Sequence, residues 1–240
     1  MLIFFDVETT GLEQDDKIVS LGIIAVDSEK ITAKYELVNE GKKIPAEASS
    51  VNHITNEMLQ GKSKFKESEI YKFLQKNNNE NITLVGHNIK FDMEKLSASG
   101  IRWRGNVIDT LRVTKHLITE CEHFSLQFLR YELKLYRDEK ALALRCGFEN
   151  EFVAHNAQCD AFIVKLLYDY HLQSVSKEQM MELSLRNVLL EKLNFGKYKG
   201  KYIEEIVMND IGYLHWMLAN VMDLDEDLRY SIVDYLEGQS

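Results

Sequence analysis

The feature that most constrains the fold of this chain is an apolar run that ends in two carboxylates. The run "LIFF" occupies residues 2–5, and Asp6 and Glu8 follow it with one residue between them. Side chains two residues apart point to the same face of a β-strand. A strand here therefore places Asp6 and Glu8 side by side, and burying two like charges is costly unless something positive lies between them. Either the pair faces solvent or it holds a cation.

Apolar runs and turn signals along the chain predict a mixed sheet flanked by helices. β-Branched runs at 18–26 and 31–38 follow the first run closely, which predicts an antiparallel meander of three strands. Spacing of apolar residues then predicts a strand at 81–87, a strand followed by a helix within 106–118, and helices over 68–78, 91–100, 125–136 and 157–173. Strands that come first and then alternate with helices are typical of an α/β fold.

The pattern changes after residue 173, and we expect the chain to have two parts. The sequence "SKEQ" at 176–179 predicts a capping box at the start of a further helix. No Pro- or Gly-rich linker marks the change, so the boundary is soft. We assign residues 1–175 to a main domain and residues 176–240 to a small C-terminal appendage.

Composition narrows the setting of the protein. The three cysteines, Cys121, Cys146 and Cys159, are widely spaced, which fits a reducing cytoplasm and excludes a cysteine-based zinc site. No apolar run approaches the about 20 residues that span a bilayer, so we expect a cytoplasmic protein without membrane contact. The net charge of −9 argues against nucleic-acid binding. It leaves the question open, because metal-binding carboxylates count in that sum and a local basic patch can coexist with it.

Two later segments repeat the pairing of an acid with a strand end or helix start. In "VGHNIKFD", His87 and Asn88 end a predicted strand and Asp92 begins the next helix. In "HNAQCDA", His155 precedes Asp160 by five residues, so the two do not share a helix face. A loop position for His155 would bring its imidazole to the same cleft as the Asp160 carboxylate.

The order of these motifs resembles the DEDD exonuclease superfamily, in its subgroup with a catalytic histidine. "FFDVETTGL", "VGHNIKFD" and "HNAQCDA" match the first, second and third motifs of that family. The resemblance implies a ribonuclease-H-like fold with a five-stranded mixed sheet. It also implies that Asp6, Glu8, Asp92 and Asp160 hold metal ions and that His155 is the general base.

The chemistry explains why these residue types are needed. Two divalent ions can stabilise both the attacking and the leaving oxygens when a phosphodiester is hydrolysed. Oxygen ligands without cysteine suit Mg²⁺ or Mn²⁺. Such ions offset the repulsion between Asp6 and Glu8, and a histidine can accept the proton of the attacking water at neutral pH.

The resemblance also suggests residues that contact the substrate. The backbone amides of Thr9 and Thr10 and the side chain of Leu12 would cradle and wedge the terminal nucleotide. His87 and Asn88 are placed where they could contact this nucleotide or its phosphate. A purely structural role at the strand end is an equal alternative for His87 and Asn88.

The C-terminal segments "FGKYKGK" and "DIGYLHW" resemble the tail of the bacterial exodeoxyribonuclease X family. "GKYKGK" is not a phosphate-binding loop, because the glycine spacing is one residue short and a tyrosine replaces the required Ser or Thr. If the segment is extended, Lys197, Lys199 and Lys201 share one face that can follow a phosphate backbone. The alternative is a solvated lysine face over tyrosines that belong to the core.

We therefore expect a metal-dependent 3′→5′ exonuclease that hydrolyses single- or double-stranded DNA to nucleoside 5′-monophosphates in repair or end processing. A 3′→5′ exoribonuclease and a polymerase proofreading subunit are alternatives, because the same motifs serve RNA and DNA. A non-catalytic nucleic-acid-binding module is an alternative of another class. The complete set of four acids and a histidine favours the enzyme.

Overall fold

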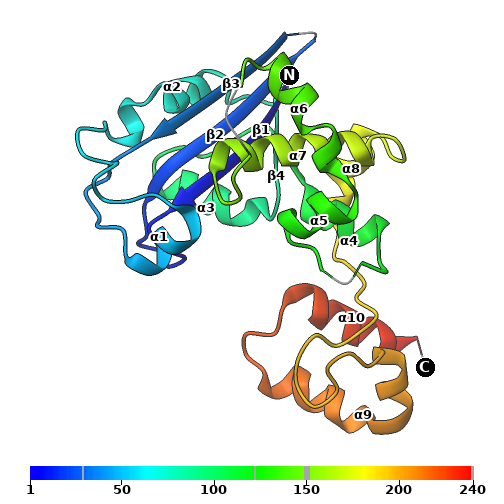
Figure 1. Ribbon diagram of the computed structural model, residues 1–240. Coiled ribbons are helices and arrows are strands. Elements are labelled where there is room, and N and C mark those ends of the chain that lie inside the picture. Colours follow the sequence, from blue (N-terminus) through cyan, green and yellow to red (C-terminus); the bar gives the residue numbers. More distant parts are fainter. Residues whose placement is uncertain (29, 122, 149–151, 239–240) are drawn as a thin grey trace. The chain divides into compact units, whose positions relative to one another are not determined.

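A mixed five-stranded sheet forms the centre of the larger part of the protein (Figure 1). The computed structural model describes residues 1–28, 30–121, 123–148 and 152–238. The strands lie in the order β3-β2-β1-β4-β5 and are β1 (Leu2–Thr9), β2 (Ile18–Asp27), β3 (Lys30–Leu37), β4 (Thr83–Gly86) and β5 (Asn106–Asp109). The first three strands are antiparallel, while β4 pairs parallel to β1 and β5 parallel to β4. The predicted meander and mixed sheet are confirmed.

Helices fill most of the remaining described chain. They are α1 (Ala46–Asn52), α2 (Glu69–Lys76), α3 (Ile89–Ala98), α4 (Thr110–Leu117), α5 (Leu126–Glu132), α6 (Glu139–Arg145), α7 (Ala157–His171), α8 (Lys177–Leu183), α9 (Ile203–Asn220) and α10 (Glu226–Glu237), with 3₁₀ helices η1 (Phe65–Glu67) and η2 (Leu135–Arg137). The helix predicted over 125–136 is wrong in length: α5 ends at Glu132, because Lys134 takes a left-handed conformation with φ of 58°. The predicted capping box is present between Ser176 and Gln179.

The two faces of β1 pack against different helices, which separates the apolar core from the acids. Ile3 and Phe5 belong to the core cluster that also contains Ile70 of α2 and Leu96 of α3. Phe4 points to the other face, where its ring meets that of a tyrosine in α7 at 5.3 Å. Asp6 and Glu8 have the same parity as Phe4, so they lie on the face that α7 covers (Figure 1).

The chain divides into two compact units. The first comprises Met1–Thr114 with Glu122–Ser184, and the second comprises Lys115–Cys121 with Leu185–Ser240. Helix α8 belongs to the first unit, so the C-terminal part of the second unit begins after residue 184. The assignment of 176–240 as a separate appendage stays a prediction.

The three cysteines are free thiols. Among the helices of the described residues, none combines the length and the apolar character that crossing a membrane requires. The cytoplasmic location stays a prediction.

A glycine in β2 sets how closely α7 approaches the sheet. Gly22 is paired with Asp6 across the β1–β2 ladder, so a side chain here would point to the α7 face. A Cβ atom at Gly22 would lie 2.1 Å from the carbonyl oxygen of Ala157 and 2.3 Å from the backbone nitrogen of Gln158. The obstacle is backbone, which cannot rotate away. Only glycine therefore permits the first turn of α7 to rest directly on β2.

We expect Gly22→Ala to destabilise the first unit, because α7 must move away from the sheet to admit the methyl group. The free energy of unfolding should fall by about 1–3 kcal/mol, the usual effect of overpacking, or by more. Urea unfolding followed by circular dichroism measures this. Gly212→Ala is a control, because the only atom near a Cβ there is 3.8 Å away. Equal stability of Gly22→Ala and the wild type would contradict the close approach.

Candidate functional site

The site is built on the end of β1, where two predicted acids project side by side. Asp6 and Glu8 lie on the α7 face, and both are partly buried. The structure thus answers the question that the sequence raised, because the pair does not stand freely in solvent. A covering helix and a third and fourth acid lie next to it.

Asp92 reaches the site from the first turn of α3. Its Oδ1 accepts a hydrogen bond of 3.2 Å from the backbone N–H of Val7, and the residue is only 5% exposed. Parallel pairing of β1 with β4 covers residues 2–4 of β1 alone, so the Val7 N–H lies beyond that ladder. The carboxylate of Asp92 takes the place of a strand partner and fixes α3 to β1.

Asp160 and His155 flank the start of α7, as the sequence predicted. Asn156 caps the helix, its side chain accepting hydrogen bonds of 3.2 Å from the N–H groups of the third and second residues after it in the chain. Asp160 lies one turn inside and is buried, whereas His155 lies on the preceding loop with φ of 57° and is exposed. The backbone N–H of His155 hydrogen-bonds the Asp160 carboxylate. Ligand atoms of Glu8, His155 and Asp160 lie within 4.8 Å of one another.

The carboxylates are close enough to perturb each other strongly. Desolvation raises the pKa of Asp6 well above its usual range, and the charges of Asp92, Asp160 and Glu8 raise it further. Burial raises the pKa of Glu8 to about 8, with added repulsion from Asp160 and Asp92. Burial also raises the pKa of Asp92 to about 8 and that of Asp160 to about 7. The four carboxyl groups are difficult to ionise at the same time without a counter-charge. A cation bound among them would stabilise their ionised forms.

The donor set fits a hard divalent metal ion. An ion could be held by three of these residues without the others, namely Glu8, His155 and Asp160. The carboxylates of Asp6 and Asp92 are close to this group. All the acids offer oxygen, which Mg²⁺ and Mn²⁺ prefer. The structure therefore brings together all five residues that the sequence singled out for metal binding and catalysis.

A hydrogen-bonded chain that the sequence reasoning missed holds Asp160 in place. The Gln127 amide donates to Asp160 Oδ1 at 2.7 Å, and its oxygen accepts from Arg130 at 3.3 Å. Arg130 in turn forms a buried bidentate pair with Glu139 of α6. Gln127 and Arg130 are one helical turn apart on α5, and that spacing was the only sequence signal for their shared face.

The loop after β1 is held by side chains of its own. The Thr10 hydroxyl donates to Asp16 at 2.6 Å, and the Thr10 N–H donates to the carbonyl of Lys17 at 2.9 Å. Hydrogen bonds from Lys42 and Thr10 lower the pKa of Asp16 to about 2. The Thr10 amide is thus already used, which argues against its predicted role in cradling a nucleotide. Leu12 is 83% exposed.

The two predicted contact residues at the end of β4 differ in their surroundings. Both ring nitrogens of His87 are engaged, with the Thr110 hydroxyl at 3.0 Å and the carbonyl of Phe124 at 2.7 Å. These bonds favour the structural alternative for His87. Asn88 is exposed, has φ of 60°, and donates its backbone N–H to Asp109 at 2.9 Å. A nucleotide contact by Asn88 stays a prediction.

The lysine segment in the second unit is a turn and is not extended. Residues 197–200 form the turn, so the expected face of Lys197, Lys199 and Lys201 does not exist as a strand face. The reason lies in Gly196 and Gly200, whose φ values of 75° and 83° reverse the chain. Contact of these lysines with nucleic acid stays a prediction, which no longer depends on an extended conformation of the segment.

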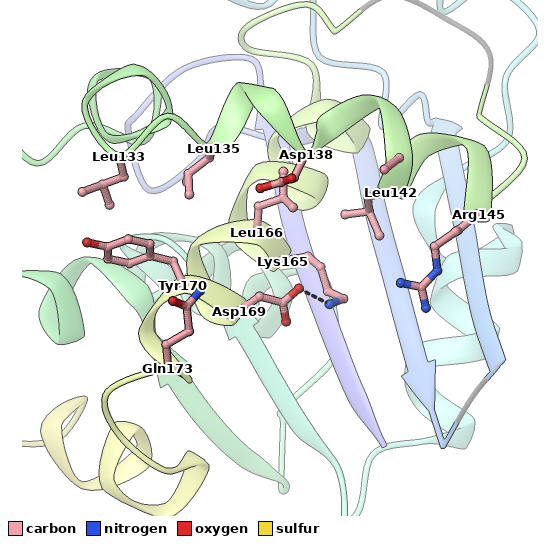
Figure 2. A pocket seen from close by; sticks show the side chains of 11 residues that line it. Leu133, Leu135, Asp138, Leu142, Arg145, Lys165, Leu166, Asp169, Tyr170 and Gln173 are labelled. Atoms are coloured by element: carbon pink, nitrogen blue, oxygen red, sulfur yellow. Dashed lines mark hydrogen bonds and ion pairs between the residues drawn. The ribbon is translucent and has the colours of Figure 1, made fainter.

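A cavity of about 270 Å³ lies elsewhere in the first unit, between α6 and the later turns of α7 (Figure 2). An ion pair of 2.5 Å joins Lys165 and Asp169 within it, and Leu142 and Arg145 line its other side. The residues that line it include none of the five predicted for metal binding and catalysis. The cavity is separate from the candidate site.

The raised pKa values predict how metal-free protein responds to pH. The pKa of Glu8 is about 8 in the folded protein and about 4.5 when unfolded, so its contribution to stability is present below pH 4.5. This contribution is lost as pH rises to 8. In EDTA we expect the melting temperature of the wild type to fall across that interval more than that of Glu8→Gln. Thermal melts at pH 5 and pH 8 test this, and parallel curves would contradict it. Added Mg²⁺ should restore stability at pH 8.

We expect Gln127→Ala to loosen the Asp160 carboxylate. Loss of a partner that orients a metal ligand typically lowers metal affinity by about 10–100-fold. Isothermal titration with Mn²⁺ measures the affinity, and a thermal melt in EDTA shows whether the fold is retained. Gln75→Ala, at an exposed position of α2, is the control. Unchanged Mn²⁺ affinity in Gln127→Ala would show that the hydrogen bond does not position Asp160.

Comparison with known proteins finds exonucleases over most of the chain. A family model described as Exonuclease matches residues 3–168, and one described as Exodeoxyribonuclease X-like C-terminal matches residues 193–221. Exodeoxyribonuclease 10 of Escherichia coli K12 is 26% identical, over 99% of this chain and 100% of its own length. The DNA polymerase III subunit epsilon of Treponema pallidum is 30% identical, over 68% of this chain and 73% of its own length.

A solved structure supports the fold. Exonuclease X, determined in complex with 5′ overhanging duplex DNA, superposes with a TM-score of 0.60 and 24% sequence identity. The alignment covers 77% of this chain and 99% of that one. The sheet is therefore of the predicted ribonuclease-H-like type. Since the Exonuclease model spans more than half of the residues and includes all five that meet at the end of β1, the chain belongs to this exonuclease family.

Proposed function

We propose that the chain is a metal-dependent 3′→5′ exodeoxyribonuclease that releases nucleoside 5′-monophosphates. The observation that carries the proposal is the convergence of four carboxylates from β1, α3 and α7 with the loop imidazole of His155. Exodeoxyribonuclease 10 of Escherichia coli K12, which aligns over its whole length, is an exodeoxyribonuclease by name, and this favours DNA as the substrate.

Asp6, Glu8, Asp92 and Asp160 would hold two divalent ions, Mg²⁺ or Mn²⁺, which supply electrostatic stabilisation to the attacking and leaving oxygens. The burial of these acids and the rise of their pKa values support this assignment. The Gln127 amide keeps one Asp160 oxygen occupied and so fixes the direction of the other.

His155 acts as the general base. Its side chain is exposed on a loop, so it can reach a water at the cleft, while its backbone N–H holds it against Asp160. The imidazole takes a proton from the attacking water as the new P–O bond forms. The bond from phosphorus to the 3′ oxygen breaks, and that oxygen acquires a proton from solvent. The exposed side chain of Leu12 is proposed to wedge against the terminal base.

The test is a gel assay with 5′-labelled single-stranded DNA and RNA of matched sequence, in Mg²⁺ or Mn²⁺. We expect a descending ladder on DNA that EDTA, Asp6→Ala or a blocked 3′ end abolishes. His155→Ala should lower the rate by about 10²–10⁴-fold, the usual contribution of a general base. Glu47→Ala, at an exposed position of α1, is a surface control.

The rival functions give different outcomes in this assay. A ladder on RNA alone would keep the mechanism and replace the substrate with that of an exoribonuclease. Activity that requires an added polymerase would indicate a proofreading subunit. No ladder on either substrate, together with a metal-induced rise in melting temperature that Asp6→Ala removes, would leave a binding module with an intact metal site.

A further inference from the structure

The two C-terminal motifs pack on each other through one carboxylate. Asp210 interrupts α9, with φ of −154°, and its Oδ2 accepts from the Lys197 ammonium at 2.9 Å and the Tyr198 hydroxyl at 2.8 Å. Its Oδ1 accepts from the backbone N–H of Tyr213 at 3.3 Å. The hydroxyl of Tyr213 accepts from the Lys197 N–H at 3.2 Å. These contacts give Tyr198 and Asp210 a role in forming the turn.

An aromatic ladder leads from this turn to an exposed indole. The rings of Tyr198 and Tyr213 meet edge to face at 5.1 Å, and Tyr213 stacks on Trp216 at 5.9 Å with planes 24° apart. Trp216 is 53% exposed, unlike a core tryptophan. The stacked Tyr213 ring restricts the motion of the indole. The side chain of Trp216 therefore loses little conformational entropy when a ligand binds to it.

Positive charge is concentrated in the segment that carries Tyr198, the first ring of the ladder, although the unit is rich in acids. Residues 192–203 contain four lysines and no acidic residue. Lys197 lies 4.6 Å from the centre of the Tyr198 ring and within the ion pair to Asp210. Lys199 and Lys201 are exposed, and in the described part of the chain neither takes part in an ion pair. Their ammonium groups are available to an anionic partner.

We propose that Trp216, Tyr213, Lys197, Lys199 and Lys201, which we call the indole–lysine surface, bind single-stranded DNA. A flat exposed ring stacks on any base, and lysines in the same compact unit can neutralise phosphates. This is the usual combination in proteins that bind single strands without sequence preference. A duplex hides its base faces and cannot stack on the indole. The choice of DNA as the strand rests on the proposed function.

The chain contains two tryptophans, which permits a direct test. In a Trp103→Phe background of the full chain, Trp216 is the only tryptophan. Titration with oligo(dT) in EDTA, where hydrolysis cannot occur, should quench its fluorescence, and a matched duplex should not. In fluorescence anisotropy, Trp216→Ala in the otherwise natural chain should weaken binding by about tenfold.

The lysines are tested by salt dependence. Lys199→Ala with Lys201→Ala should reduce the slope of log affinity against log salt by about 0.7 for each phosphate that these two side chains neutralise. Tyr230→Ala, an exposed aromatic of α10 outside the indole–lysine surface, should change neither affinity nor slope.

Unquenched Trp216 together with unchanged affinity of Trp216→Ala would overturn the inference, as would equal quenching by duplex DNA. The nuclease assay separates this result from the proposed function. A DNA ladder without quenching would leave the exonuclease and remove the indole–lysine surface. Quenching without any ladder would support the indole–lysine surface and contradict the proposed exonuclease activity.

Discussion

The close approach of α7 to β2 at Gly22 is the constraint on which the site depends. A Cβ atom at this position would lie within 2.1–2.3 Å of backbone atoms of Ala157 and Gln158, far inside van der Waals contact. Because it is absent, the start of α7 lies on the same patch of sheet that carries Asp6, the ladder partner of Gly22. The helix then brings Asp160 over the sheet, close to other carboxylates that repel its negative charge. Buried apolar residues of α7 pack on the sheet, and burial of apolar surface opposes the repulsion among the carboxylates.

Much of this could be predicted from the sequence because it depends on local spacing. The alternation of a strand fixes Asp6 and Glu8 to one face, and the five-residue interval from His155 to Asp160 excludes a shared helix face. The chain Asp160–Gln127–Arg130–Glu139 could not be predicted in the same way. Its members come from three helices, and a glutamine and an arginine one turn apart look the same on a solvated helix. Only the tertiary arrangement buries Arg130 against Glu139.

The lysine segment is the opposite case, in which a local pattern predicts the wrong conformation. Alternating Lys and Tyr residues are compatible with a strand, but the glycines at 196 and 200 have positive φ and make a turn. A Cβ at Gly196 would also lie 2.4 Å from the Tyr213 hydroxyl. The glycines therefore set the conformation, and the aromatic residues of the turn and of α9 pack together on it. The stacking residue that emerges is Trp216, which lies outside the lysine motif.

Helix α3 joins the candidate metal-binding acids to the loop that we propose for nucleotide contact. Asp92 binds the backbone of β1 at Val7, and one turn later Lys95, only 4% exposed, donates to the carbonyls of Glu13 and Asp16. One helix thus fixes both the strand that carries Asp6 and Glu8 and the loop that carries Leu12. A shift of α3 would move Leu12, the proposed wedge, and Asp92, a candidate metal ligand, together. In the proposed mechanism, one rigid element therefore sets the positions of both the terminal base and the scissile phosphate, as cleavage one nucleotide at a time requires.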